Sequence, residues 1–408
     1  MNSSKRPTIC MFTNYYPPIP SGSSTYCAEL SRELVARGSR VFIITSKVIK
    51  SSPDFEEDRG VLIYRIPAFR LPQFSITLNF PWLNFTLWPG NRRRILRILR
   101  SNHPDVIHAH NHMFDMALHA IGAARRLEIP VVLSIHTIIK HTNRIFDLLL
   151  HVIDRLLVKA FIIDKADMLI CPDLIVADYV RKTYQARNIV QIPYGATVLP
   201  KADPTKVQEL RNQYDLENKP VILSLGHLHQ TRDRLELIRI LPDLVNQFPG
   251  LVLMIVGYIG TKSTLKLASK LGVKKNVICT GIVPQSEIPN YLGLTDIEAH
   301  WFNKEHQHKT PSITGQEAMS AGKVIITNAD KDILGVGVLQ DGVNAILVEP
   351  GNQTELLEKM RMVLSDPDLR EQIGRNARRT IREHLNWDMV IKRMLSAYKS
   401  AQAEHLRN

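Results

Sequence analysis

The chain has 408 residues, of which 44% are hydrophobic and 22% are charged, so it is long enough for two domains with full cores. Its four cysteines form neither a Cys-x-x-Cys pair nor a Cys/His spacing, which argues against a disulfide framework or a zinc site and favours a reducing cytoplasm. The net charge of +13 indicates an anionic partner: a phosphorylated ligand, an acidic membrane surface or nucleic acid. Nucleic acid is the least favoured, because the basic residues are not interleaved with a stacking or groove-reading motif.

Strand and helix patterns alternate along the first half of the chain, and no apolar signal segment precedes the first strand. The expected strands are 8–13, 41–45, 106–110, 131–136, 168–171 and 190–192, and the expected helices include 26–37, 116–127 and 173–184. Such alternation predicts a parallel sheet covered by helices on both faces. We assign it to an N-terminal domain of residues 1–196.

An uncharged, aromatic-rich stretch leads into a cluster of five arginines, together spanning Leu71 to Arg100. Three prolines argue against a membrane span, because they would leave backbone groups unpaired in lipid. Aromatic residues followed by cations are typical of an element at the surface of an acidic membrane. A buried loop followed by a solvated basic helix is the equal alternative.

The strand pattern restarts at residue 221, after a stretch rich in proline and polar residues. We therefore expect a connection over 197–220 and a second α/β domain over 221–384. The fold class is α/β, with two doubly wound domains that face each other across a cleft and bind ligands at the carboxyl ends of their strands.

Several of those strand ends carry unusual residues. Ser21 and Gly22 follow the first strand, His110 ends the third, and His136 ends the fourth, while Gly226 to Arg232 follows the first strand of the second domain. A histidine at a strand end is as readily structural as ligand-binding. Neither GxGxxG nor GxxxxGK[ST] occurs, so no dinucleotide or kinase-type ATP site is indicated.

A short helix is expected between Lys309 and Gly322, with Pro311 at its start and Ser312 or Thr314 as its cap. Its first amides suit a phosphate, since they lack helical partners and carry the positive end of the helix dipole. Glu317, one turn in, can accept hydrogen bonds from sugar hydroxyls. An ordinary surface helix is the alternative.

The order of these motifs resembles the retaining nucleotide-sugar glycosyltransferases of GT-B fold, the group that includes mannosyl, sucrose-phosphate and glycolipid synthases. The matching pieces are Tyr16-Pro17-Pro18 with Ser21-Gly22, and residues 105–110, 192–195, 226–232, 281–283, 317–322 and 341–351. The resemblance further implies that a closing helix, 385–408, crosses back to the N-terminal domain, which in this fold binds the acceptor.

The resemblance implies donor-binding roles in the second domain. Glu317 would bind the ribose, the helix start would bind the pyrophosphate, and the loop after the third strand of that domain would face the base. The donor-binding residues are then Glu317, Ser312, Ile313, Thr314, Gly281, Ile282, Val283 and Lys309. The donor would be a UDP- or GDP-linked sugar, with no cofactor and no metal.

The resemblance also implies catalytic residues. Arg232 stands where the family has a lysine and His227 where it has an arginine, and both would stabilise the negative charge of the departing diphosphate. His227 would do so fully only when protonated. His110 matches the family's active-site histidine, His136 is a weaker candidate, and the Ser21-Gly22 loop would border the donor phosphates and the acceptor.

Lys309 departs from the family pattern, which has glutamate at this position of a Glu-x7-Glu motif. A donor with an acidic or differently arranged sugar, a shifted acid such as Glu305, and lost activity are three competing explanations. A sugar-nucleotide epimerase and a non-catalytic binding protein therefore remain alternatives to a transferase.

The acceptor is expected to be a membrane lipid or a lipid-linked glycan, with the protein peripheral on the cytoplasmic face of the membrane. The stretch Leu71 to Arg100 and the apolar segment Ile145 to Ile163 indicate this acceptor class. A soluble acceptor is the alternative, since a segment that is apolar on most of its faces is usually a buried helix.

Overall fold

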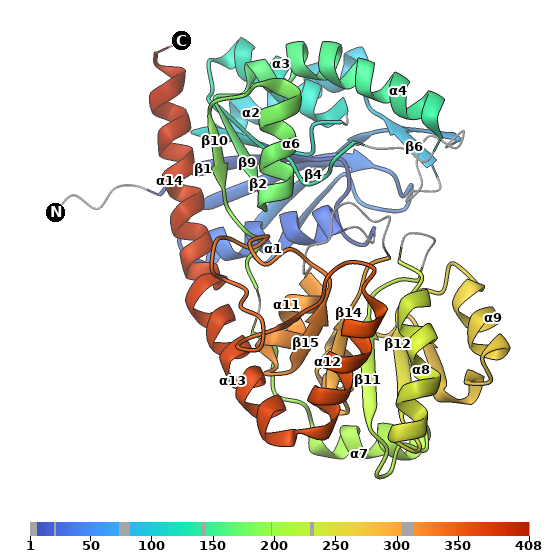
Figure 1. Ribbon diagram of the computed structural model, residues 1–408. Helices are drawn as coiled ribbons and strands as arrows, with labels where there is room; N and C mark the ends of the chain where they lie inside the picture. Colours follow the sequence, from blue (N-terminus) through green and yellow to red (C-terminus); the bar gives the residue numbers. More distant parts are fainter. Residues whose placement is uncertain are drawn as a thin grey trace. The chain divides into compact units, whose positions relative to one another are not determined.

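The computed structural model describes residues 6–19, 22–72, 82–113, 115–139, 143–196, 198–228, 232–303 and 313–407 (Figure 1). The chain divides into two compact units: unit 1, which comprises Met1–Tyr194 and Trp387–Asn408, and unit 2, which comprises Gly195–Asn386. Lys309, Ser312, Glu305 and Ser21, which the sequence singled out, lie outside the described residues.

Unit 1 is built on an eight-stranded sheet of order β10-β9-β8-β7-β1-β2-β4-β3, in which only β3 runs antiparallel to its neighbour. Its strands are β1 Thr8–Thr13, β2 Arg40–Lys47, β3 Phe55–Asp58, β4 Val61–Pro67, β7 Val106–His110, β8 Val131–Ser134, β9 Met168–Cys171 and β10 Ile189–Gln191. A separate antiparallel pair is formed by β5 Phe69–Pro72 and β6 Trp82–Phe85. The strand order reverses between β1 and β7, which makes their carboxyl ends the switch point where doubly wound sheets bind ligands.

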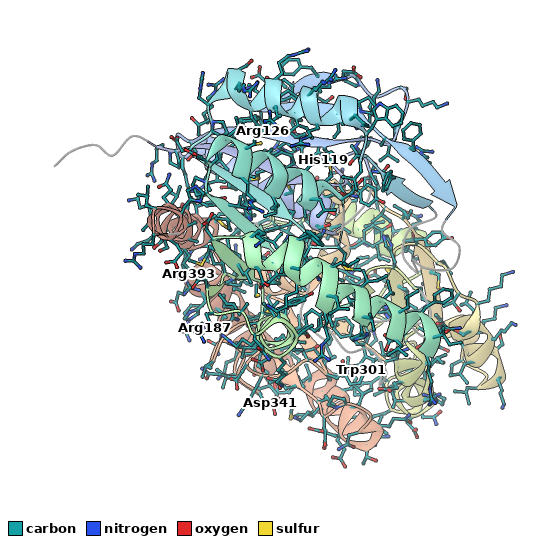
Figure 2. All side chains as sticks on the ribbon, turned by 90° about the horizontal axis from the view of Figure 1, so that it is seen from above. His119, Arg126, Arg187, Trp301, Asp341 and Arg393 are labelled. Carbon is teal, nitrogen blue, oxygen red and sulfur yellow. The ribbon has the colours of Figure 1, made fainter. Side chains whose placement is uncertain are left out.

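Helices cover both faces of this sheet. They are α1 Gly22–Ala36, α2 Pro89–Asn102, α3 Asp115–Leu127, α4 Arg144–Ile153, a π-helical turn Asp154–Val158, α5 Lys159–Phe161, a 3-10 turn Ile163–Lys165, α6 Leu174–Tyr184 and α14 Trp387–His405. Successive residues of β1 alternate between the two faces, as a strand requires. Cys10 and Phe12 pack with α2, α3 and α6, whereas Ile9 and Met11 pack with α1 and α14. Figure 2 looks onto unit 1 from above, with Arg126 and His119 marking α3.

The closing helix α14 belongs to unit 1 although nearly two hundred residues of unit 2 precede it. The hydroxyl of Tyr398 lies 2.9 Å from Nδ1 of His108 on β7, and Arg37, just after α1, pairs with Asp388 at 2.5 Å. Trp387 stacks on Tyr26 of α1 at 6.1 Å between ring centroids. These contacts attach α14 to the first sheet, as the resemblance implied.

Unit 2 has a six-stranded, wholly parallel sheet of order β13-β12-β11-β14-β15-β16. Its strands are β11 Val221–Leu225, β12 Val252–Val256, β13 Val277–Gly281, β14 Ile297–His300, β15 Val324–Thr327 and β16 Ile346–Leu347. Its helices are α7 Pro204–Gln213, α8 Leu235–Gln247, α9 Ser263–Lys270, α10 Ile288–Gly293, α11 Ile313–Ser320, α12 Gln353–Ser365 and α13 Pro367–His384, with 3-10 turns at Lys274–Asn276 and Gln285–Glu287. The strand order reverses between β11 and β14, which places the switch point of this sheet beside the residues that follow those two strands.

The predicted α/β fold class is confirmed by these two parallel, doubly wound sheets. Residues 197–220, which the sequence indicated as a connection, lie in unit 2 and include α7. Asp203 caps this helix by accepting a hydrogen bond from the Thr205 amide at 2.9 Å, and its own amide donates to Asn290 of α10 at 2.9 Å. A polar, proline-rich composition here therefore accompanies a capped helix that packs on its unit.

Candidate functional site

His110, at the carboxyl end of β7, ends a row of three polar side chains in unit 1. Its Nδ1 lies 3.0 Å from Nε2 of His136, and Nδ1 of His136 lies 2.9 Å from the Tyr194 hydroxyl. The two imidazoles are parallel, with centroids 5.3 Å apart. His110 Nε2 is buried, and the described residues offer it no hydrogen-bond partner. We call His110, His136 and Tyr194 the histidine row, and its free end is this nitrogen of His110.

The histidine row is electrically neutral at pH 7. Burial lowers the pKa of His110 well below its usual range, and neighbouring His108 and His136 lower it further. Burial alone lowers the pKa of His136 to about 4, and it raises that of Tyr194 well above its usual range. The row therefore works through hydrogen-bond direction and not through a positive charge.

Two proton arrangements are compatible with these distances. If Tyr194 donates to His136, then His136 donates from Nε2 to His110, and the free Nε2 of His110 carries a hydrogen. If His136 donates to Tyr194 instead, His110 donates from Nδ1 and its Nε2 presents a lone pair. The direction of the Tyr194 hydroxyl thus decides whether His110 offers a ligand a donor or an acceptor.

His108 shares the strand and the spacing of His110 but has a structural role. Its Nδ1 lies 2.9 Å from the Tyr398 hydroxyl, and its Nε2 lies 2.7 Å from the Ser134 hydroxyl. Both nitrogens are therefore used in joining β7 to β8 and α14. His112 is also buried, and its Nε2 lies 3.9 Å from an Asp154 oxygen.

Asn14, which directly follows β1, is a site candidate that the sequence reasoning missed. Its side chain is 2% exposed, and neither of its amide atoms has a hydrogen-bond partner among the described residues. It stands at the β1 end of the switch point, the strand next to β7. A polar residue immediately after a buried strand was the available signal. Gly22 is the first residue of α1, the helix that follows β1 along the chain.

In unit 2, two arginines follow β11. Nη2 of Arg232 donates to the Leu225 carbonyl at 3.0 Å, and the guanidinium lies 5.1 Å from the centre of the Phe302 ring. Arg234 is 1% exposed, and its Nε donates to the Ser224 hydroxyl at 2.9 Å. Its other nitrogens donate to the carbonyls of Leu225, Gly226 and Arg232 at 3.2, 3.2 and 2.6 Å. Arg234 was not singled out from the sequence, because an arginine in a polar loop is indistinguishable from a surface residue.

Among the described residues, Arg232 and Arg234 meet few carboxylates at this end of the sheet. Glu298 of β14 is fully buried and is the acidic residue that opposes the pKa shifts of both Arg232 and Arg234. Burial lowers the pKa of Arg232 to about 10, and that of Arg234 is lowered well below its usual range, by burial and then by Arg232. Asp233 raises the pKa of Arg234 as well, whereas Glu298 is the one described carboxylate that raises that of Arg232. An anion bound beside Arg232 would stabilise its charged form further.

Helix α11 is held beside Arg232. Nδ1 of His300, at the end of β14, lies 3.4 Å from Arg232 Nη2. The same imidazole packs on Gly315 in the first turn of α11, where an added Cβ would come within 3.1 Å of His300 Nδ1. Glycine at 315 is what lets the helix start approach so closely. His300 therefore contacts both Arg232 and the first turn of α11, whose described residues begin with Ile313 and Thr314.

Glu317 is buried one turn into α11 and accepts a hydrogen bond from the Gln285 side chain. Gln285 follows the loop of Gly281, Ile282 and Val283, in which Ile282 is 71% exposed. The structure thus brings the loop expected to face a base close to the carboxylate expected to bind a ribose. Gln285 was not noticed in the sequence.

His227 is exposed, and its Nδ1 accepts the Tyr258 amide at 3.0 Å. Burial first, and then Arg232 and Arg234, lower its pKa. Because a protonated ring could not accept this hydrogen bond, His227 presents Nε2–H as a neutral donor in the ligand-free protein. The sequence predicts that His227 acts fully only when protonated, whereas this geometry leaves a neutral His227 with an N–H donor.

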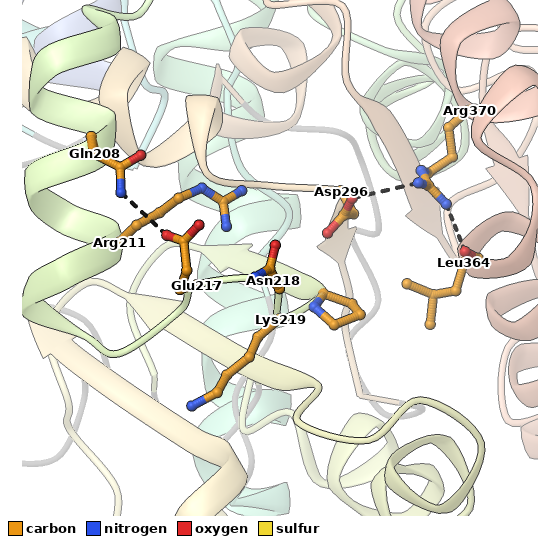
Figure 3. A pocket seen from close by; sticks show the side chains of 9 residues that line it. Gln208, Arg211, Glu217, Asn218, Lys219, Asp296, Leu364 and Arg370 are labelled. Carbon is orange, nitrogen blue, oxygen red and sulfur yellow. Dashed lines mark hydrogen bonds and ion pairs between the residues drawn. The ribbon is translucent and has the colours of Figure 1, made fainter.

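A hollow of about 400 Å³ lies at the other end of the unit 2 sheet (Figure 3). Pro220 and Asp296, which precede β11 and β14, line it together with Arg211. Asp296 pairs with Arg370 at 3.6 Å, and Gln208 donates to Glu217 at 3.2 Å. None of the sequence-predicted site residues line this hollow.

The two halves of the chain match two family models. Residues 20–198 match Glycosyltransferase Family 4, and residues 206–380 match Glycosyl transferases group 1. Alpha-monoglucosyldiacylglycerol synthase of Acholeplasma laidlawii is 25% identical over 90% of this chain and 91% of its own length.

Solved structures share the fold. Sucrose-phosphate synthase from Thermosynechococcus elongatus superposes with a TM-score of 0.70 at 18% identity, over 98% of this chain and 100% of that one. Anabaena Alr3699/HepE in complex with UDP-glucose superposes with a TM-score of 0.69 at 16% identity, over 97% of this chain and 100% of that one. With a family match in each half and this fold throughout, the chain belongs to the glycosyltransferases of GT-B fold.

Proposed function

We propose that the protein transfers a sugar from a UDP- or GDP-linked donor to a hydroxyl of a membrane lipid or lipid-linked glycan, with retention of configuration at the sugar. The observation that carries this proposal is the Arg232 guanidinium at the switch point of unit 2, held beside the start of α11 by His300, with Glu298 as the one described carboxylate that raises its pKa. A diphosphate would pair with this guanidinium and accept hydrogen bonds from it.

The donor would lie along α11. Its diphosphate would receive hydrogen bonds from the first amides of the helix and from Arg232, which His300 and Gly315 hold beside that helix. Glu317 would accept hydrogen bonds from the ribose hydroxyls, with Gln285 orienting the carboxylate. His227 would donate from Nε2 to a phosphate oxygen.

The reaction would break the bond between the anomeric carbon and the diphosphate oxygen and form one between that carbon and the acceptor oxygen. Negative charge grows on the departing diphosphate, and Arg232 stabilises it where Phe302 and the neighbouring carbonyls fix the guanidinium. The acceptor hydroxyl would give up its proton to the departing phosphate oxygen. These residues need no metal ion for that step.

His110 would contact the reacting sugar or the acceptor through Nε2. The histidine row fixes the plane of its ring, and burial keeps it neutral, so it acts as a hydrogen-bonding group and not as a proton reservoir.

Two similar proteins support separate parts of this proposal, the lipid acceptor and the nucleotide-sugar donor. The Acholeplasma laidlawii relative is named as a synthase of a glucosylated diacylglycerol, and the Anabaena structure holds UDP-glucose. Within the described ranges, no helix has the length and apolar character required to cross a bilayer. A lipid acceptor would then be reached from the membrane surface.

The described part of the stretch Leu71 to Arg100, together with nearby Phe69, would be one point of contact with an acidic membrane; residues 73–81 lie outside the described residues. Phe69 and Trp88 lie edge to face at 5.9 Å and are 56% and 58% exposed, and Phe85 is 42% exposed. Arg92, Arg93 and Arg97 of α2 are exposed as well. Aromatic rings beside solvent-facing cations suit the headgroup region of anionic lipids.

A thermal-shift screen with nucleoside diphosphates and their sugars tests the donor. A ligand that binds the folded state raises the midpoint of unfolding with its concentration, and we expect UDP or GDP compounds to do so. Arg232→Ala should abolish the shift. No shift with any uridine or guanosine diphosphate would refute the donor assignment.

A further inference from the structure

Helix α4 exposes an apolar surface that nothing described above uses. No residue of Arg144–Ile153 is buried. The large apolar side chains of α4, the π turn and α5 that face solvent are Ile145, Leu148, Leu149, Val152, Leu156, Leu157 and Phe161, with exposed fractions of 78, 68, 52, 46, 65, 53 and 59%. We call these residues the α4 face. The alternative that this segment is a buried helix does not hold for α4.

The spacing of the α4 face places its residues together. Ile145, Leu148, Leu149 and Val152 stand at i, i+3, i+4 and i+7, which is one side of a helix. Leu156 continues the row one turn further. A contiguous apolar side of this length is uncommon on a protein that meets only water.

The opposite side of the same segment is fastened to unit 1 by a carboxylate. Asp154 is fully buried and accepts hydrogen bonds from the hydroxyls of Tyr179 and Tyr184 of α6. Val158 joins the hydrophobic core four residues later. The segment thus turns an acidic group inward and leucines outward, the reverse of the usual arrangement for a water-facing helix. The exposed leucines therefore belong to a helical segment that is anchored to unit 1 on its other side.

The charges around the α4 face are mainly positive. Over residues 143–165, Arg144, Arg155, Lys159 and Lys165 oppose Asp147 and Asp164 on the exposed and half-buried surface, and Lys159 pairs with Asp164 at 2.7 Å. The core that receives Val158 also receives Ile95 of α2, so the arginine-rich helix covers the same face of the sheet. A second copy packed face to face would bring these cations together, whereas anionic lipids would neutralise them.

We propose that the α4 face docks on an anionic lipid bilayer, with its leucines at the depth of the headgroups and the adjacent cations on lipid phosphates. Surface-bound apolar helices flanked by basic residues bind membranes in this way. Docking here would bring the protein to a lipid acceptor, so the inference deepens the proposed function. It rests on that function for the purpose of docking and not for the docking itself.

Vesicle sedimentation tests the docking without any sugar transfer. The intact protein should sediment with vesicles that contain phosphatidylglycerol and far less with phosphatidylcholine alone. Leu148→Ser combined with Leu149→Ser should lower the partition coefficient by roughly tenfold or more, since each leucine loses its apolar burial in lipid. The control pair Val336→Ser and Met362→Ser, at exposed apolar positions of unit 2, should bind as the unchanged protein does.

A second measurement covers a folding defect in the double variant. Leu149→Trp should fold normally, and its added fluorescence should be quenched by vesicles of brominated phosphatidylglycerol. Unchanged sedimentation of the double variant, or absence of that quenching, would overturn the proposal. It would also be overturned by a dimer that the double variant converts to a monomer, which would assign the α4 face to a second copy. If the intact protein binds acidic vesicles, the double variant does not, and neither transfers sugar, the docking inference stands and only the proposed function is refuted.

Discussion

Nδ1 of His110 lies 3.0 Å from Nε2 of His136, and this single contact ties the strand end expected to meet the acceptor to Tyr194. The direction of the Tyr194 hydroxyl therefore decides which nitrogen of His110 carries the hydrogen, although Tyr194 has no proposed contact with the substrates. His136 and Tyr194 are therefore positioning residues, and their removal should change turnover more than binding.

We expect His136→Ala to lower kcat by about tenfold to 100-fold while the Kd for the nucleoside diphosphate stays within about twofold, because the row would orient His110 and the proposed nucleotide site is in unit 2. Steady-state kinetics and calorimetry with the nucleoside diphosphate would measure both. Tyr398→Phe is the matched control: it removes the same kind of hydrogen bond from His108 and should lower the free energy of unfolding by about 1 kcal/mol with kcat unchanged. An unaffected kcat in His136→Ala would show that the row is structural.

Stability should fall steeply on mild acidification. Burial lowers the pKa of His136 to about 4 and those of His108 and His112 to about 3, all below the ordinary value of 6.5. Between pH 6.5 and pH 4 the unfolded chain thus binds protons that the folded protein refuses, so the free energy of unfolding decreases as the pH falls. Each such histidine contributes about 1.4 kcal/mol per pH unit once the unfolded side chain is protonated.

Urea denaturation at pH 7, 6 and 5 measures this slope. His136→Gln, which keeps a polar side chain but cannot titrate, should reduce the slope by about 1.4 kcal/mol per pH unit. Equal slopes for the two proteins would contradict a neutral, buried His136.

Replacement of Arg232 should act oppositely on binding and on stability. Arg232→Met removes a half-buried cation next to buried Arg234 and keeps an apolar stem on Phe302, so the ligand-free protein should be equally stable or more stable. Nucleoside diphosphate affinity should fall by about 2 to 3 kcal/mol, roughly 30-fold to 150-fold, because a hydrogen-bonded charge is lost. Thermal melts and calorimetric titrations give the two values. Arg211→Met, in the hollow at the other end of the sheet, should leave binding unchanged.

Gln285 should matter for nucleotide binding although it lies outside α11. Gln285→Ala removes the side chain that donates to Glu317 and should weaken nucleoside diphosphate binding by about 1 kcal/mol, whereas Glu317→Ala should weaken it more. A double-mutant cycle over the two positions should give a coupling energy above about 0.5 kcal/mol. Additive losses would mean that Gln285 does not orient Glu317.

Binding to acidic vesicles should depend on α2. Changing Arg92, Arg93 and Arg94 to Ser should cost about 1 kcal/mol for each freely exposed arginine and less for Arg94, which pairs with Asp54 at 3.0 Å. Sedimentation at two salt concentrations measures this loss, and the difference between the proteins should shrink at high salt. Unchanged sedimentation would remove α2 from the membrane contact.

Local patterns were sufficient to predict most of the alternating elements, the parallel character of both sheets and a helix that ends just before Gly322, because strand length, periodicity and caps are properties of neighbouring residues. They missed β3, β4, β5 and β6, which follow β2 along the chain. They did not separate His108 from His110. The two residues share a strand face, and only Ser134 and Tyr398, distant in sequence, occupy both nitrogens of one and leave the other open. Buried Arg234 was missed for the same reason, since its partners are carbonyls fixed by the fold.

From the sequence, the apolar segment Ile145 to Ile163 indicated either a lipid-acceptor region or a buried helix, and the structure exposes most of its large apolar side chains. Composition cannot reveal which side of a helix faces the core when an acidic residue supplies the inward anchor. Asp154 has that role here, and the tyrosines that bond it lie on another helix.

Product analysis with a labelled nucleotide sugar tests the central claim most directly. Incubating the protein with UDP- and GDP-sugars, with and without diacylglycerol vesicles, should release one nucleoside diphosphate for each glycolipid formed, only when the acceptor is present. Arg232→Met should abolish that release. Interconversion of the sugar nucleotide without release, or nucleotide binding with no product from any donor and acceptor pair, would contradict sugar transfer by this chain.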